Sequence, residues 1–166
     1  AAIGKVIRRL LWFLIVLYVL SYMDRINIGF AALSMNRDLG LTPTAFGLAN
    51  TIFYVGYMLF EVPSNLAMER VGARRWICRI MMTWGLASSA MVFVAGPVSF
   101  FVLRFLLGVA EAGFFPGMIL YLTYWFPAAM RARFVASFMV AVPLASAVGA
   151  PISALLLGMD GLLGLK

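Results

Sequence analysis

Residues 10–35 read LLWFLIVLYVLSYMDRINIGFAALSM, an apolar run long enough to cross a lipid bilayer. A spanning helix needs about 20 mostly apolar residues to cross roughly 30 Å of hydrocarbon. The run carries one acid and one base, Asp24 and Arg25, close to its middle. It therefore predicts a transmembrane helix that holds two adjacent charges inside the membrane.

The rest of the chain repeats this pattern, with polar or helix-breaking residues between the apolar runs. Thr42-Pro43-Thr44 is typical of a helix start, and Ala95-Gly96-Pro97 predicts a very tight turn. The further helices are expected at residues 45–68, 76–94, 99–125 and 132–157. The fold class is therefore all-α, a multispanning membrane bundle of five helices that forms one domain over residues 1–166.

The composition excludes several classes of protein. Hydrophobic residues make up 64% of the chain and charged residues 11%, with a mean hydropathy of +1.02, which does not suit a soluble domain. There is no His and one Cys, Cys78, so neither a His/Cys metal site nor a disulfide framework is expected. We expect no cofactor. The net charge of +7 does not indicate nucleic-acid binding, because the basic residues lie at the ends of apolar segments.

The distribution of Lys and Arg predicts the orientation in the membrane. Nine basic residues fall on one side of the expected helices: Lys5, Arg8, Arg9, Arg70, Arg74, Arg75, Arg79, Arg131 and Arg133. Two fall on the other side, Arg37 and Lys166. Because basic residues concentrate in cytoplasmic loops, the N-terminus is expected to be cytoplasmic.

Five charged residues remain inside the expected helices: Asp24, Arg25, Glu61, Arg104 and Glu111. A charge at the bilayer centre costs at least about 2.5–3.5 kcal/mol, so these side chains are expected to face a bundle interior or a watery cavity. Arg104 and Glu111 are seven residues apart and so share one face of their helix. Static interhelical ion pairs are the alternative, although buried pairs add little stability.

A carboxyl group beside Arg in such a cavity is well suited to exchanging a proton, because burial and nearby charge act oppositely on its ionisation. Tyr57 and Glu61 share a helix face at i, i+4. Tyr22 and Tyr57 could contact a ligand or simply pack in the core, and the sequence leaves both possibilities open.

The loop at residues 69–75, Glu-Arg-Val-Gly-Ala-Arg-Arg, resembles the signature loop of the major facilitator superfamily. It departs in having Glu69 for the usual Asp and Asn65 where a Gly often stands. Residues 22–27 (YMDRIN), 60–65 (FEVPSN) and 104–117 (RFLLGVAEAGFFPG) together resemble its anion:cation symporter family. That resemblance extends over residues 11–164. The family includes transporters of tartrate, hexuronates, aldonates and aromatic acids.

The resemblance implies roles for individual residues. The substrate-binding residues would be Arg25, which would hold a carboxylate, with Tyr22, Tyr57 and Asn27. The proton-coupling residues would be Asp24, Glu111 and Arg104. Conformational gating would fall to Glu69, Arg70, Gly72, Arg74 and Arg75. Val142 stands where sugar-acid transporters can offer a polar amide, which argues against a substrate with many hydroxyls.

The family's members have two six-helix bundles with the substrate between them, so the chain is expected to be an N-terminal fragment that stops before helix six. The resemblance implies proton-coupled symport of small organic anions, such as tartrate or sugar acids, across a bacterial inner membrane. The partners would be the anion, protons, lipid and a missing C-terminal bundle. A proton-independent exchanger or facilitator is the alternative, and a structural membrane subunit a more remote one. An enzyme is not expected, because no catalytic constellation is present.

Overall fold

The computed structural model describes residues 12–158, and all the regular structure in that range is helical. The six α-helices are α2 (Trp12–Asp38), α3 (Pro43–Val71), α4 (Ala73–Ala90), α5 (Pro97–Glu111), α6 (Phe114–Trp125) and α7 (Ala128–Gly158). A short 3-10 helix, η2 (Met91–Phe93), extends α4. Lys5, Arg8, Arg9 and Lys166, which enter the orientation count, lie outside the described residues.

Local sequence explains where two of the turns fall. The Thr42 hydroxyl accepts a hydrogen bond of 3.1 Å from the Ala45 amide and Pro43 opens α3, which is a favoured helix start. Gly72 alone separates α3 from α4 and has φ 94°, a conformation that side chains with a Cβ rarely adopt. The Gly in the expected signature loop therefore has a backbone role.

Within residues 12–158, five stretches are long and apolar enough to cross a membrane, which confirms the expected multispanning all-α fold. These are Trp12–Phe30, Pro43–Val71, Ala73–Phe93, Pro97–Tyr124 and Val135–Leu155. Many large apolar side chains point outward: Leu86 is 73% exposed and Met58 71% exposed. Such surfaces suit a hydrocarbon environment, because the bilayer core contains no water and apolar side chains can face the lipid tails there.

The fourth span differs from the sequence prediction of one helix over residues 99–125. It consists of α5 and α6, separated at Ala112 and Gly113. Ala112 has ψ 133° and Gly113 has φ 80°, so neither continues the helix. A Cβ added to Gly113 would lie 2.5 Å from the Ser64 hydroxyl oxygen, so the break also brings this backbone close to α3.

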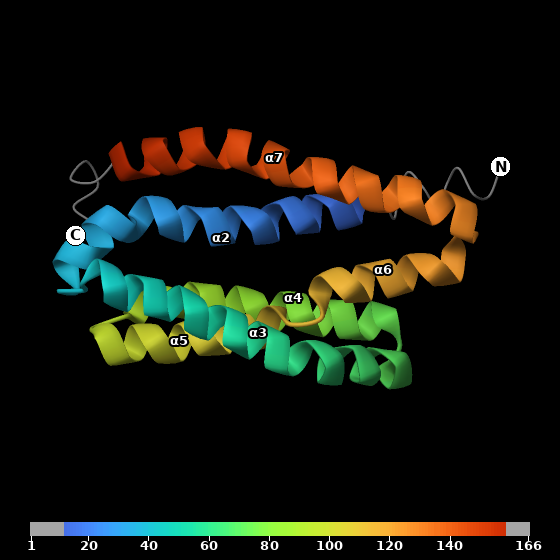
Figure 1. Cartoon of the computed structure of the whole chain (residues 1–166), viewed down its shortest axis with the longest axis horizontal. Helices are drawn as coiled ribbons and strands as arrows, with labels where there is room; N and C mark the ends of the chain where they lie inside the picture. Colours follow the sequence, from blue (N-terminus) through green and yellow to red (C-terminus); the bar gives the residue numbers. More distant parts are fainter. Residues whose placement is uncertain (1–11, 159–166) are drawn as a thin grey trace. The chain divides into compact units, whose positions relative to one another are not determined.

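The described helices form two compact units (Figure 1). The first contains α7 and α2 up to Leu33, and the second runs from Ser34 to Trp125. In the first unit α2 and α7 lie side by side, with the Tyr18 and Phe138 rings edge to face at 5.9 Å. In the second, α3 crosses α5 with α4 alongside. The single bundle expected over residues 1–166 stays a prediction.

Candidate functional site

The predicted site residues are divided between the two units. Tyr22, Asp24, Arg25 and Asn27 lie on α2 in the first unit. Tyr57 on α3 and Arg104 and Glu111 on α5 lie in the second.

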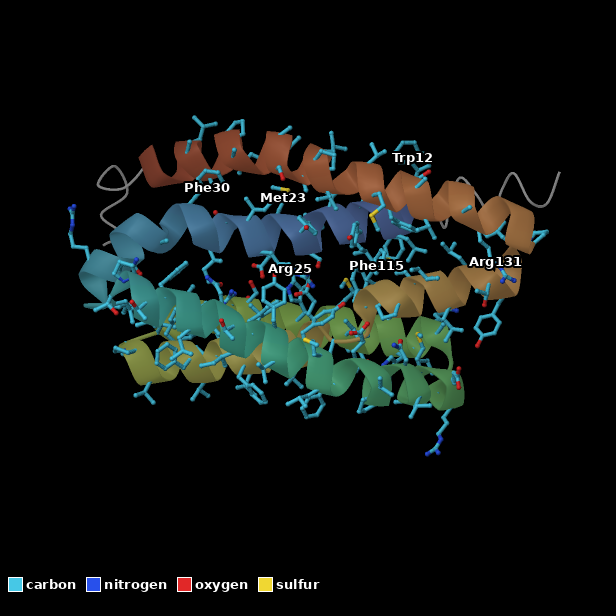
Figure 2. All side chains as sticks on the ribbon, viewed as in Figure 1. Trp12, Met23, Arg25, Phe30, Phe115 and Arg131 are labelled. Carbon is cyan, nitrogen blue, oxygen red and sulfur yellow. The ribbon has the colours of Figure 1, made fainter. Side chains whose placement is uncertain are left out.

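Arg25 lies near the middle of α2, on the side opposite Met23, which faces α7 (Figure 2). Its guanidinium carbon is 5.9 Å from the centroid of the Tyr22 ring. Both side chains are half-buried, as is Asp24 between them in sequence. The three residues therefore cluster polar and cationic groups at mid-span, and the Arg25 donors lie beside an aromatic ring that can orient them.

Asn27 has a structural partner on the neighbouring helix. Its side-chain oxygen accepts a 2.8 Å hydrogen bond from the hydroxyl of Ser153, which is on α7 and buried. Interhelical bonds of this kind fasten membrane helices to each other. The structure thus gives one atom of this predicted ligand a role in joining α2 to α7. Ser153 was not among the predicted residues, because a Ser 126 positions away gives no sequence signal.

Arg104 is 4% exposed, although it stands within a membrane span. Its terminal nitrogen donates a hydrogen bond to the side-chain oxygen of Asn50 on α3, and its guanidinium carbon is 4.8 Å from the centroid of the Phe53 ring. A polar acceptor and an aromatic face thus surround part of the buried cation. The sequence prediction missed Asn50. A side-chain amide within an apolar helix could have indicated a buried polar contact at this position.

Arg104, Gly108 and Glu111 form one buried face of α5, as their spacing predicts. A Cβ added to Gly108 would lie 2.1 Å from the Phe53 carbonyl oxygen of α3. One added to Gly56 would lie 2.8 Å from the Phe105 carbonyl oxygen of α5. The two glycines therefore let the α3 and α5 backbones touch, in the manner of small-residue contacts between membrane helices.

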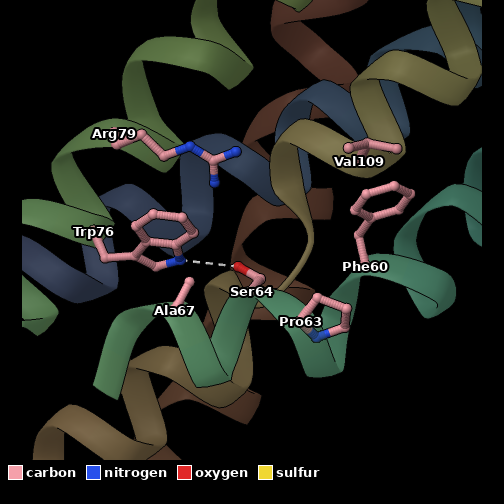
Figure 3. Close-up of a pocket in the computed structure, with 7 residues that line it drawn as sticks. All are labelled: Phe60, Pro63, Ser64, Ala67, Trp76, Arg79 and Val109. Atoms are coloured by element: carbon pink, nitrogen blue, oxygen red, sulfur yellow. Dashed lines mark hydrogen bonds between the residues drawn. The ribbon is translucent and has the colours of Figure 1, made fainter. Parts of the chain in front are cut away.

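Glu111 is fully buried and is the last residue of α5, directly before the break in the fourth span. The Ser64 hydroxyl of α3 donates a 2.8 Å hydrogen bond to the Ala112 carbonyl oxygen at this break. It also accepts one of 3.0 Å from the indole nitrogen of Trp76 on α4 (Figure 3). Ser64 therefore joins α3, α4 and the end of α5 next to Glu111. Backbone freed by a broken membrane helix needs such partners.

Tyr57 and Glu61 are both half-buried on α3. The Tyr57 ring centroid is 6.3 Å from that of Phe53, so Tyr57 adjoins the aromatic residue that covers Arg104. The described contacts of Tyr57 thus lie within the second unit and combine aromatic packing with closeness to the buried cation.

The α3–α4 connection carries the residues expected to act in gating. Glu69, Arg70, Arg74 and Arg75 are all exposed. Within the part of the chain that the structure describes, no ion pair joins Glu69 to any of the three arginines. The charges of this loop are therefore available to other groups in the conformation described.

Residues 12–158 contain no group of three or more His, Cys, Asp or Glu side chains that could hold a metal ion. A sequence model of the Major Facilitator Superfamily matches residues 14–162. The chain belongs to this superfamily. This superfamily is one of membrane transporters, so the family placement favours a transporter over an enzyme.

Several curated members of the superfamily are similar over nearly the whole chain. A protein of Agrobacterium vitis named as a tartrate transporter is 58% identical, covering 97% of this chain and 36% of its own length. A quinolone resistance transporter of Acinetobacter baumannii is 49% identical over 92% of this chain and 35% of its own. The inner membrane transport protein RhmT of Escherichia coli is 44% identical over 94% of this chain and 36% of its own. The chain thus spans little more than a third of these superfamily members.

Proposed function

We propose that the protein carrying this chain is a proton-coupled symporter of small organic anions, with tartrate-like dicarboxylates as the first candidates. The observation that supports this most is the placement of Arg104 and Glu111, two buried ionisable residues on one face of a membrane-spanning helix. Such residues are costly in a membrane and mark ion or substrate pathways. The similarity to a protein named for tartrate transport supports the choice of substrate class.

Arg25 would bind the substrate carboxylate. A guanidinium offers two parallel N–H donors that match the two oxygens of a carboxylate. Tyr22, whose ring lies beside the Arg25 guanidinium, would orient that group and offer a hydroxyl to the anion. Tyr57 and the amide nitrogen of Asn27 would supply further polar contacts, the Asn27 oxygen being bonded to Ser153.

Asp24 and Glu111 would take up protons as the anion binds. Each protonation removes one negative charge from the membrane interior, so the loaded carrier can reorient at lower electrostatic cost. Arg104, on the same buried face of α5, would partly balance the negative charge of Glu111 within the membrane. The loop residues Glu69, Arg70, Gly72, Arg74 and Arg75 would change contacts as the helices move.

A second helix bundle of the same protein would complete the transport path, because alternating access needs two halves that rock against each other.

We place the N-terminus in the cytoplasm of a bacterium and the protein in the inner membrane, in line with the name of the E. coli relative. Single cysteines placed at Arg74 and Arg37, in a variant without Cys78, would test this. An impermeant thiol reagent should label only position 37 from outside the cell, and labelling at 74 would reverse the orientation.

The test of coupling is uptake of labelled tartrate by proteoliposomes that hold the complete protein, with and without an inward proton gradient. Glu111→Gln keeps the shape of the side chain but cannot carry the proton. It should lower gradient-driven accumulation at least ten-fold and leave tartrate counterflow in place. Unchanged accumulation would remove Glu111 from the coupling step, and insensitivity of the native protein to a protonophore would favour the exchanger or facilitator.

The role of Arg25 is tested separately by Arg25→Lys, which keeps the charge and removes the bidentate fork. The KM for tartrate should rise at least ten-fold. The matched control is Arg37→Lys, since Arg37 is an exposed arginine at the end of the same helix. Equal KM values for the two variants would contradict the assignment.

A further inference from the structure

A pocket of about 180 Å³ lies between α3, α4 and α5, within the second unit (Figure 3). Its apolar wall is formed by Phe60, Pro63 and Val109, and its polar wall by Ser64, Trp76 and Arg79. None of the residues with proposed transport roles lines it. The pocket is partly open, and Phe60 at its edge is 42% exposed.

The Arg79 guanidinium is the charged group of this pocket. Its central carbon is 4.4 Å from the centroid of the Trp76 ring, and the side chain is half-buried. Figure 3 shows it reaching from α4 toward the space between α3 and α5. Residues 12–158 offer Arg79 no carboxylate partner. This contact is with the face of an aromatic ring and not with a hydrogen-bond acceptor, so it leaves the N–H donors of the guanidinium for an anion.

The other polar groups of the pocket are already bonded to each other. Ser64 accepts from Trp76 at 3.0 Å and donates to the Ala112 carbonyl oxygen at 2.8 Å. The single N–H of the indole and the single O–H of the hydroxyl are therefore both used. An anion in this pocket would be held by Arg79, while apolar atoms of the same ligand would meet Phe60, Pro63 and Val109.

The depth of Arg79 in the membrane indicates which anion can reach it. It lies less than two helical turns after α4 begins, or about 9 Å along the axis at about 1.5 Å per residue. A long arginine side chain at this depth can extend to the headgroup level. Arg70, Arg74 and Arg75 are exposed at the same end of the unit. Clusters of basic residues beside membrane helices attract anionic lipid headgroups.

We propose that this pocket binds the phosphate of an anionic phospholipid through Arg79, with the glycerol and upper acyl chain against Phe60, Pro63 and Val109. An amphiphile satisfies both walls at once, whereas a small free anion would satisfy only the cationic side. The site rests on the membrane placement of the chain and does not depend on which substrate is carried or on proton coupling.

The test uses the complete protein in detergent, titrated with phosphatidylglycerol and followed by native mass spectrometry. Arg79→Gln should weaken phosphatidylglycerol binding at least ten-fold and leave the weaker binding of zwitterionic phosphatidylcholine unchanged. Arg37 is an exposed arginine just before the start of α3, at the end of that helix away from Arg79. The Arg37→Gln variant should therefore bind phosphatidylglycerol like the native protein. Equal phosphatidylglycerol binding by Arg79→Gln and native protein would overturn the site.

Two further arms separate other sources of binding. Arg74→Gln removes a charge from the same end without touching the pocket, so a loss as large as that of Arg79→Gln would reduce the effect to diffuse surface attraction. Inorganic phosphate or tartrate that displaced the lipid at equal concentration would make this a small-anion site and would refute the lipid assignment. If Arg79→Gln does not fold, Val109→Trp fills the pocket while keeping Arg79. It should weaken phosphatidylglycerol binding to the same extent, and normal binding by Val109→Trp would overturn the site.

Discussion

Among the described glycines, Gly108 is the one where an added Cβ would come closest to a neighbouring atom, which makes Gly108→Ala the most informative of these substitutions for stability. The added Cβ would lie 2.1 Å from the Phe53 carbonyl oxygen, 3.0 Å from the Phe53 carbonyl carbon and 3.1 Å from the Tyr57 amide nitrogen. All three atoms belong to the α3 backbone, so no side-chain rotation can relieve the clash. Ordinary contact begins at 3.4 Å, so the α3 and α5 backbones would have to separate by about 1.3 Å.

The expected change in free energy follows from two opposing effects. Overpacking of a tight core costs about 1–3 kcal/mol, and a clash with rigid backbone belongs at the upper end of that range. Replacing Gly by Ala within a helix gains up to about 1 kcal/mol. The free energy of unfolding should therefore fall by about 2 kcal/mol. The measurement is reversible unfolding of the complete protein in mixed detergent micelles.

Gly85→Ala is the matched control, because Gly85 lies within α4 and has no atom within 4 Å of an added Cβ. It should leave stability unchanged or raise it by up to about 1 kcal/mol. Gly56→Ala, with its nearest clash at 2.8 Å, should fall between the two. If Gly108→Ala were as stable as Gly85→Ala, the close crossing of α3 and α5 would be refuted.

Two hydrogen-bonded positions lead to further predictions. Ser64→Ala should lower the free energy of unfolding by about 1–3 kcal/mol, because it leaves the Trp76 N–H and the Ala112 carbonyl oxygen without their bonds; the same unfolding measurement applies. In a double-mutant cycle, Asn27→Ala and Ser153→Ala should show a coupling energy of about 0.6 kcal/mol, within the range for membrane helices, for the 2.8 Å bond that joins α2 to α7.

The control for Ser64→Ala is another serine of the same chain. Ser146 is exposed and, among the residues that the structure describes, bonds only to the Val142 carbonyl oxygen of its own helix. Ser146→Ala should therefore change stability by less than about 0.5 kcal/mol. A Ser64→Ala variant that unfolds like Ser146→Ala would argue against the three-helix junction. A coupling energy of zero in the cycle would argue against the α2–α7 bond.

The family resemblance was readable from a few short motifs and is confirmed by the match over residues 14–162. The buried face of α5 was also predictable, because residues spaced by four and then three positions share one side of a helix. Ser153 was missed because its partner is 126 residues away. Asn50 could have been noticed as an amide in an apolar helix, but its partner, 54 residues away, could not be read from the sequence. The roles of Arg25, Asp24, Arg104 and Glu111 in transport stay predictions.

The sequence by itself determined that the chain is helical and crosses a membrane. In hydrocarbon every backbone N–H and C=O must find a partner inside the protein, and a continuous apolar run of about 20 residues supplies these partners by forming a helix. Only the tertiary structure decided how the helices are held and which group satisfies the backbone where one of them breaks. The fourth span ends and restarts at Ala112 and Gly113, where Pro116 has no N–H to offer the Ala112 carbonyl oxygen, and Ser64, on another helix, bonds to that oxygen instead. A contact between distant segments has no local signal in the sequence.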